Sequence, residues 1–452
     1  MPYHGLSMTA PNPSSSLLEA FEHQEQIFGS AFSILQEGIA HHAFPAASVA
    51  VTHRGCLVAL KALGHFTYAT LSENSAEGAP PFSRSVREGG DFDFESTALK
   101  AGAPLLAGFA RSGQGTVTPT TLFDLASLTK VVATTPMAMI LYERGLLDLD
   151  APVSAIFPEF TTTAEKDPRR SDVTIRMLLS HSSGLPAYEK LFLKARTRTE
   201  LLKAALTIPL TADPATRTEY SDIGFIILGL ALERLADESL DRFCQREIFS
   251  PLAMTNTTFN PPANLRSRIP STADEREDVC GSDTLVRQLP KADQLPSVSP
   301  RSTFRNRVIQ GEVQDENASV LGGVAAHAGL FSTAEDLAKF AHAILTKTNP
   351  IFRPETISLF TRREPAPPGT SRALGWDTPY SPSQSGKYFS SQSFGHLGYT
   401  GTSLWIDPVR QLSITLLTNR TWPDCSNQAI KTIRPILHDA VIEALENSSD
   451  PA

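Results

Sequence analysis

Apolar residues near the N-terminus change from one periodicity to another. Six of them recur at steps of three, four or seven, which is the spacing of an amphipathic helix packed on another element: Leu17, Phe21, Phe28, Phe32, Leu35 and Ile39. Residues 47–52 and 56–63 are then short, apolar and partly β-branched. The segment His53, Arg54 and Gly55 between them predicts a β-hairpin. We therefore expect one helix and two strands from this end of the chain.

The C-terminal end repeats these elements in reverse order. Residues 402–406 and 412–418 predict a second hairpin, and residues 427–445 predict a last helix. Helical patterns dominate from about 120 to 260 and again at 333–347, where a capping box runs from Ser332 to Glu335. The predicted fold class is therefore α+β. An antiparallel sheet made from both ends of the chain is flanked by terminal helices, and a helical domain is inserted between its halves.

This pattern also predicts domain boundaries. We expect the sheet domain to contain residues 17–110 and 365–452, and the mainly helical domain to contain residues 111–364. Residues 69–118 are rich in Ser, Gly, Pro and Glu, and residues 261–310 carry six Pro with little periodicity, so both are predicted loop insertions. Pro136 lies in the uncharged run 131–142, where it should kink a helix.

Composition and charge exclude several classes of function. The 452 residues carry a net charge of −8 without a block of Lys or Arg, which argues against a nucleic-acid partner. The longest strongly apolar stretch, 224–232, is about half the length of a membrane span, and residues 1–16 lack the features of a secretory signal. We therefore expect a cytoplasmic protein without a membrane partner. Four scattered cysteines predict reduced thiols and no metal site: Cys56, Cys244, Cys280 and Cys425.

One serine stands in a spacing that suits nucleophilic catalysis. The chain has no G-x-S-x-G motif, but Ser127 precedes Lys130 by three residues at the expected start of a helix, which places hydroxyl and amine on one face. Lys130 is the only lysine with a serine at that spacing. It precedes a long uncharged stretch, and burying its ammonium is costly unless the group has a partner and a task.

Six segments together resemble the serine β-lactamase and penicillin-binding-protein-like superfamily, in its class C β-lactamase, esterase and D-aminopeptidase-like branch. The match runs from about Phe44 to Asn419, and the segments are LFDLASLTK (122–130), GLLDLDAPV (145–153), MLLSHSSGL (177–185), YSDIGF (220–225), LGGVAAHAGLFSTAEDL (321–337) and FGHLGYTGTSLWIDP (394–408). The resemblance implies a β-lactamase/transpeptidase-like fold. It also implies Ser127 as the nucleophile, Lys130 as the group that takes its proton, and Tyr220 as a shared base and acid. We expect the Lys130 cation to hold the Tyr220 phenol near its ionised form.

Two positions depart from the family's pattern. His396 stands where class C β-lactamases have the lysine of K-T-G, so we expect an imidazole whose charge varies near neutral pH and which hydrogen-bonds Tyr220 or the substrate. Asp222 replaces an asparagine, and it could orient Lys130. Gly398 would allow a close backbone approach, and the resemblance implies an oxyanion hole made by the N–H groups of Tyr399 and Ser127.

These residues predict a serine hydrolase that forms an acyl-enzyme with a small ester or amide and needs no cofactor. Two alternatives stay open: an acyltransferase using the same acyl-enzyme, and a catalytically inactive binding protein of this fold. Because the edge strand lacks a fixed cation, we expect neutral esters to be favoured over penicillins and cephalosporins. His181 and His327 have no metal-ligand spacing and are predicted to be structural. The oligomeric state is left open.

Overall fold

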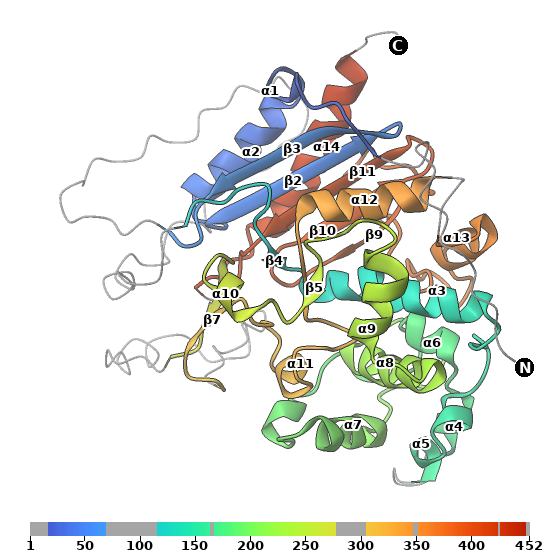
Figure 1. The fold of residues 1–452 in the computed structure, drawn as a ribbon. Helices are drawn as coiled ribbons and strands as arrows, with labels where there is room; N and C mark the ends of the chain where they lie inside the picture. The colour runs from blue at the N-terminus through green and yellow to red at the C-terminus, as the bar shows by residue number, and fades with distance from the viewer. Residues whose placement is uncertain are drawn as a thin grey trace, which may run out of the picture.

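A six-stranded sheet made from both ends of the chain organises the molecule (Figure 1). This computed structural model describes residues 17–68, 115–162, 167–276, 304–346, 351–423 and 425–448. The strand order is β1-β3-β2-β11-β10-β9. All neighbouring pairs are antiparallel except β1 with β3. The predicted α+β class is therefore confirmed.

Two hairpins form most of the sheet, as predicted. The first joins β2 (Ala46–His53) to β3 (Cys56–Gly64) through Arg54 and Gly55, whose φ angles of 49° and 85° give the left-handed turn that matches strand twist. The second joins β10 (Ser403–Asp407) to β11 (Leu412–Thr418). Pairing of β11 with β2 joins the two ends of the chain. The short strand β9 (Phe394–Leu397) forms the edge.

Both faces of the sheet are covered by helices, because successive side chains of a strand point to opposite faces. On β2, Val49 and Val51 pack in the cluster that contains α2 (Gly29–Ala40) and α14 (Ile430–Asn447). Ala50 faces the other cluster, which contains α12 (Ala334–Leu345) and the helical region. Figure 1 shows α2 and α14 on one side of the sheet and α12 on the other.

The expected N-terminal helix begins later than its apolar pattern indicates. Residues Leu18–Glu19 form β1, which pairs with the outer edge of β3, and the helical segments are α1 (Gln24–Ile27) and α2. The N–H groups of Leu18 and Ala20 donate to carbonyls of the first hairpin. This pairing covers an exposed strand edge, which outweighs the helical spacing of Leu17 and Phe21.

Two further predictions need correction. The N-cap of α12 is Thr333, which accepts from the Asp336 N–H, so the cap lies one residue later than the predicted box. The predicted insertion 261–310 contains α10 (Ala263–Arg266) and a two-stranded sheet of β6 (Ser271–Asp274) with β7 (Val308–Gln310). Pro136 is the second residue of α3 (Thr135–Glu143), which continues directly from the π-helical turn Lys130–Thr134, and the kink at this proline stays a prediction. Residues 69–114 and 277–303 lie outside the described residues.

Helices dominate the middle of the chain, as predicted. The segment before Ser127 belongs to a small sheet of β4 (Phe123–Asp124), β8 (Leu330–Ser332) and β5 (Thr258–Phe259). The remaining helices are α4 (Val153–Ile156), α5 (Glu159–Thr162), α6 (Ile175–Leu179), α7 (Arg198–Thr207), α8 (Asp222–Ala236), α9 (Leu240–Cys244), α10 (Ala263–Arg266), α11 (Glu316–Val320) and α13 (Pro354–Thr361). The domain boundaries stay a prediction.

Candidate active site

Ser127 lies in a tight turn that the preceding carboxylate holds. The chain leaves β4 and enters a short 3₁₀ helix, Ala126–Leu128, in which Ala126 adopts a left-handed φ of 47°. Such a backbone is strained for a residue with a Cβ. The Ala126 N–H donates to Asp124 Oδ1 (2.8 Å), and the Gln314 N–H donates to Asp124 Oδ2 (2.7 Å). Burial raises the pKa of Asp124 to about 6, so this carboxylate is mostly ionised at pH 7.

Lys130 is fully buried, and its ammonium has three acceptors. Nζ donates to Ser127 Oγ (3.0 Å), to Asp222 Oδ1 (2.6 Å) and to the carbonyl of His327 (3.0 Å). These contacts use all three N–H donors of a protonated lysine. Burial lowers the pKa of Lys130 below its ordinary value, and the Asp222 carboxylate opposes that shift. The amine is therefore easier to deprotonate than a lysine in water.

Tyr220 reaches the same oxygen from the start of α8. Its hydroxyl donates to Ser127 Oγ (2.7 Å), and its ring lies 4.9 Å from Lys130 Nζ. Burial, and then the Asp222 carboxylate, raise the pKa of Tyr220 well above its ordinary value. The expectation that cations hold this phenol near its ionised form is therefore wrong. Tyr220 is a neutral hydroxyl that can donate a proton.

Asp222 is placed by the capped N-terminus of α8. The side chain of Ser221 accepts from the Gly224 N–H (3.0 Å), and the Asp222 N–H donates to the Ala187 carbonyl (2.9 Å). The Asp222 side chain is thus fixed in the first helical turn, facing Lys130. The structure shows the Asp222–Lys130 contact that the sequence suggested as an alternative to substrate binding.

The turn between β9 and β10 lies against the segment that carries Ser127. Hydroxyl groups of Thr400 and Thr402 donate to the carbonyls of Asp124 (2.8 Å) and Leu125 (3.0 Å). A Cβ on Gly398 would lie 2.5 Å from the Leu125 carbonyl oxygen, so only glycine fits there. The close approach at Gly398 is therefore to the chain before Ser127. Among the described residues, the N–H groups of Tyr399 and Ser127 have no acceptor.

His396 is buried on β9 and differs from its predicted behaviour. Its Nδ1 lies 2.8 Å from the Leu397 carbonyl, so this nitrogen carries the proton. Its ring centroid lies 5.9 Å from that of Tyr220, without a hydrogen bond between the two side chains. Burial, and then the Lys130 and Arg372 cations, lower the pKa of His396 well below its ordinary value. Its charge therefore does not vary near neutral pH.

Three contributors to the site were not predicted from the sequence. His327 supplies a carbonyl to Lys130, and its Nε2 lies 2.9 Å from Asp315 Oδ1. The ring of His181 lies 4.7 Å from that of Tyr220, and its Nδ1 accepts from the Ser221 N–H. Burial, followed by nearby cations, lowers the pKa of His181 well below its ordinary value. Both segments belong to recognised motifs, but side-chain spacing alone does not indicate these contacts.

Arg372 is the third contributor, and no sequence motif marks it. Its guanidinium carbon lies 5.6 Å from the Tyr220 ring centroid, and its side chain is 18% exposed. A single β-bridge pairs Arg372 with Asp377, which in turn bridges Gly395 of the edge strand. The edge strand β9 itself carries His396 and no Lys or Arg, as the sequence predicts, but a cation reaches the site from another segment. A guanidinium from outside the motifs lies beside Tyr220.

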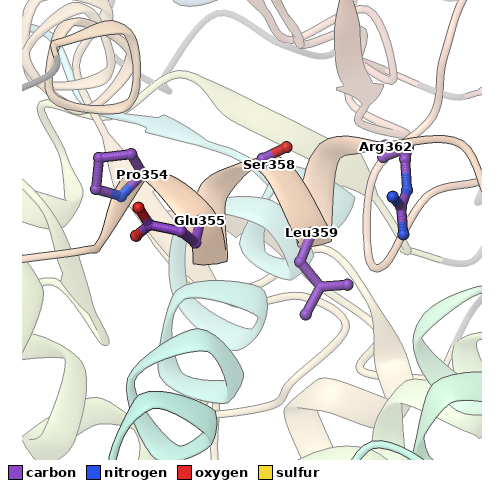
Figure 2. A pocket seen from close by; sticks show the side chains of 5 residues that line it. All are labelled: Pro354, Glu355, Ser358, Leu359 and Arg362. Atoms are coloured by element: carbon purple, nitrogen blue, oxygen red, sulfur yellow. The ribbon is translucent and has the colours of Figure 1, made fainter.

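Other surface and compositional features lie apart from these residues. A hollow on α13 is lined by Pro354, Glu355, Ser358, Leu359 and Arg362, none of which contacts Ser127 in the structure (Figure 2).

The described segments contain no group of three or more His, Cys, Asp or Glu that could hold a metal ion. None of the helices within the described ranges could span a membrane. Cys56, Cys244 and Cys425 are free thiols, and Cys280 lies outside the described residues.

The sequence is similar to proteins with known names. A family model described as Beta-lactamase matches residues 32–434. The N-acetylmuramyl-L-alanine amidase of Bacillus subtilis (strain 168) is 33% identical over 66% of this chain and 68% of its own length. A protein of Salmonella agona (strain SL483) named for D-alanyl-D-alanine carboxypeptidase activity is 30% identical over 69% of this chain and 72% of its own.

Solved structures share the fold at low sequence identity. EstCE1, described as a hydrolase with promiscuous acyltransferase activity, superposes with a TM-score of 0.65 at 20% identity and covers 92% of this chain and 99% of its own. A class C beta-lactamase superposes with a TM-score of 0.60 at 15% identity, covering 94% of this chain and 97% of its own. These similarities confirm the fold that the sequence motifs imply.

Proposed function

Since the chain belongs to the beta-lactamase family of serine hydrolases, we propose that it cleaves a small amide or ester through an acyl-enzyme on Ser127. One observation carries this proposal: Lys130 Nζ and the Tyr220 hydroxyl both lie within hydrogen-bond distance of Ser127 Oγ. A nucleophile with a base and an acid at this distance meets the geometric requirement of covalent catalysis.

The positions of the protons on Ser127, Lys130 and Tyr220 define the order of the proposed catalytic steps. When Lys130 is a neutral amine, it accepts the Ser127 proton while Oγ bonds to the substrate carbonyl carbon and the carbonyl π electrons move to oxygen. Collapse of this intermediate breaks the bond to the leaving group, which takes the Tyr220 proton. Tyr220 recovers a proton from the Lys130 ammonium. Water then attacks the acyl-enzyme in the same way, releasing the acid and restoring Ser127.

The two relatives from Bacillus subtilis and Salmonella agona favour an amide over an ester. Both are named for the cleavage of amide bonds, and each is at least 30% identical to this chain. The finer assignment to an esterase therefore has less support than an amidase or peptidase activity. The acyltransferase alternative stays a prediction, which product analysis in the presence of an added amine tests.

A covalent label tests the nucleophile. We expect a fluorophosphonate to add one label to the wild-type protein and none to the Ser127→Ala variant, because Ser127 has the base that activates a hydroxyl. Intact-mass spectrometry measures the label, and Ser183→Ala, at a buried serine of a neighbouring motif, is the matched control. Equal labelling of wild type and Ser127→Ala would rule out Ser127 as the nucleophile.

The pH dependence of activity tests the roles of Lys130 and Asp222. Lys130 must lose its proton to act as a base, so kcat/KM should rise with pH through the lowered pKa of Lys130. Asp222→Asn removes the carboxylate that raises this pKa, so the rise should move to lower pH. We propose measuring kcat/KM from pH 5 to 10 (roughly the range in which such groups titrate). A profile that stays in place, or moves to higher pH, would contradict this assignment of the base.

Arg372 provides a physical reason for a charged leaving group. Among the described residues its guanidinium donates no hydrogen bond, and the nearest carboxylate oxygen of Asp377 lies 3.8 Å away. In the proposed mechanism the Tyr220 hydroxyl gives its proton to the leaving group. Because Arg372 lies beside the Tyr220 ring, the leaving group comes close to this cation. A planar guanidinium binds carboxylates through paired N–H donors. We therefore propose that the leaving group carries a carboxylate, as in an amide of an amino acid.

Substrate charge tests this assignment of Arg372. We expect Arg372→Met to lower kcat/KM for an N-acylamino acid by at least about tenfold, the effect of one lost charged contact. Turnover of neutral p-nitrophenyl acetate should change by less than about twofold. Arg363→Met, at a neighbouring arginine that donates to Thr378 Oγ1, is the matched control. Equal losses on both substrates would show that Arg372 does not select for charge.

A further inference from the structure

Two buried arginines hold the turn between β9 and β10 through its carbonyl groups. Arg420 follows β11 and Arg434 lies on α14, and their exposed fractions are 6% and 4%. Arg420 Nε donates to the Tyr399 carbonyl (2.7 Å), and Arg434 Nη2 donates to the Gly401 carbonyl (3.1 Å). The Thr400 carbonyl accepts from the Arg420 backbone N–H (3.0 Å). Successive carbonyls of the turn are therefore fixed by these two residues.

Neither guanidinium has a carboxylate partner in the described part of the chain. The remaining acceptors of Arg420 are the carbonyls of Cys425 and Asn427, and Arg434 also donates to Gln384 Oε1 (2.9 Å). Burying an unpaired cation is energetically unfavourable. Two such cations side by side add mutual repulsion, and burial followed by Arg420 lowers the pKa of Arg434 to about 9. Stability alone does not explain this pair.

Among the described residues, the turn keeps one backbone donor without an acceptor beside the segment that leads to Ser127. Its carbonyls point to the arginines, while the Tyr399 N–H has no acceptor among the described residues. Hydroxyls of Thr400 and Thr402 fix the turn to the chain before Ser127. A donor that is oriented in advance and backed by positive charge stabilises an oxygen that becomes negative.

We propose that Arg420 and Arg434 are positioning residues for the oxyanion, a role that rests on the proposed function. They fix the carbonyls of Tyr399 and Gly401, so that the Tyr399 N–H keeps its direction, and they place two positive charges behind it. The negative charge on the substrate oxygen exists only in the tetrahedral state. Removing either arginine should therefore lower kcat and leave KM nearly unchanged.

A boronic acid separates this role from a merely structural one. The Ser127 oxygen donates an electron pair to boron, its proton passes to Lys130, and the adduct is a tetrahedral anion that resembles the transition state. We expect Arg434→Met to weaken phenylboronic acid binding and to lower kcat for p-nitrophenyl acetate by roughly 30-fold each, less than the loss of a direct donor. KM should stay within about threefold. Arg410→Met, at a partly exposed arginine of the β10–β11 hairpin that pairs with Glu446, should change neither value.

Each outcome of this experiment is informative. A folded Arg434→Met protein with unchanged kcat and boronate affinity would overturn the proposal, as would a loss confined to KM. If Arg434→Met does not fold, Arg434→Lys replaces it in the test, since lysine keeps the charge but loses the paired donors of arginine. We expect Arg434→Lys to lower kcat threefold to tenfold (roughly the effect of one hydrogen bond). An unchanged kcat in this variant would overturn the proposal. Two other results would instead contradict the proposed function, and this inference with it. One is a wild-type protein that does not bind phenylboronic acid, and the other is a Ser127→Ala variant that keeps its activity.

Discussion

The buried ammonium of Lys130 is the interaction on which the site depends. Burying a cation costs least when every donor has an acceptor. The three acceptors come from separate parts of the chain: the turn at Ser127, the first turn of α8 at Asp222, and the carbonyl of His327 before β8. Satisfying Lys130 therefore brings these segments together, and Tyr220 reaches Ser127 because it lies two residues before Asp222.

A second constraint joins the helical region to the sheet. Ser127, the proposed nucleophile, follows Ala126 with its strained left-handed backbone, and Asp124 accepts a hydrogen bond from the Ala126 N–H. From the sheet side, Thr400 and Thr402 bond to the carbonyls just before Ser127, and Gly398 leaves room for that approach. The proposed base thus belongs to one part of the fold and the proposed oxyanion donor to another, and their relative position depends on these few hydrogen bonds.

Local patterns in the sequence were sufficient to predict both hairpins and the Ser127–Lys130 pair, and the resemblance to the family added Tyr220 to that pair. Period-two alternation and one helical turn act over short distances, and the family motifs add the pairing of distant segments. Arg372 could not be found in this way, because it reaches Tyr220 only through bridges along the edge strand. The ionisation of Tyr220 and His396 was predicted wrongly because their burial depends on packing that no local pattern records. The N-terminal helix was placed too early because pairing with a strand edge decided the structure there.

The proposed mechanism depends on burial, which lowers the pKa of Lys130 and so makes its amine a base that Ser127 can use. An NMR titration of the protein labelled in its lysine side chains measures this pKa directly, with the Lys130 signal assigned by its loss in Lys130→Arg. We expect Lys130 to titrate clearly below the ordinary lysine value of 10.5, and lower still in Asp222→Asn. A Lys130 side chain that titrates at or above 10.5 in the folded protein would rule out this mechanism.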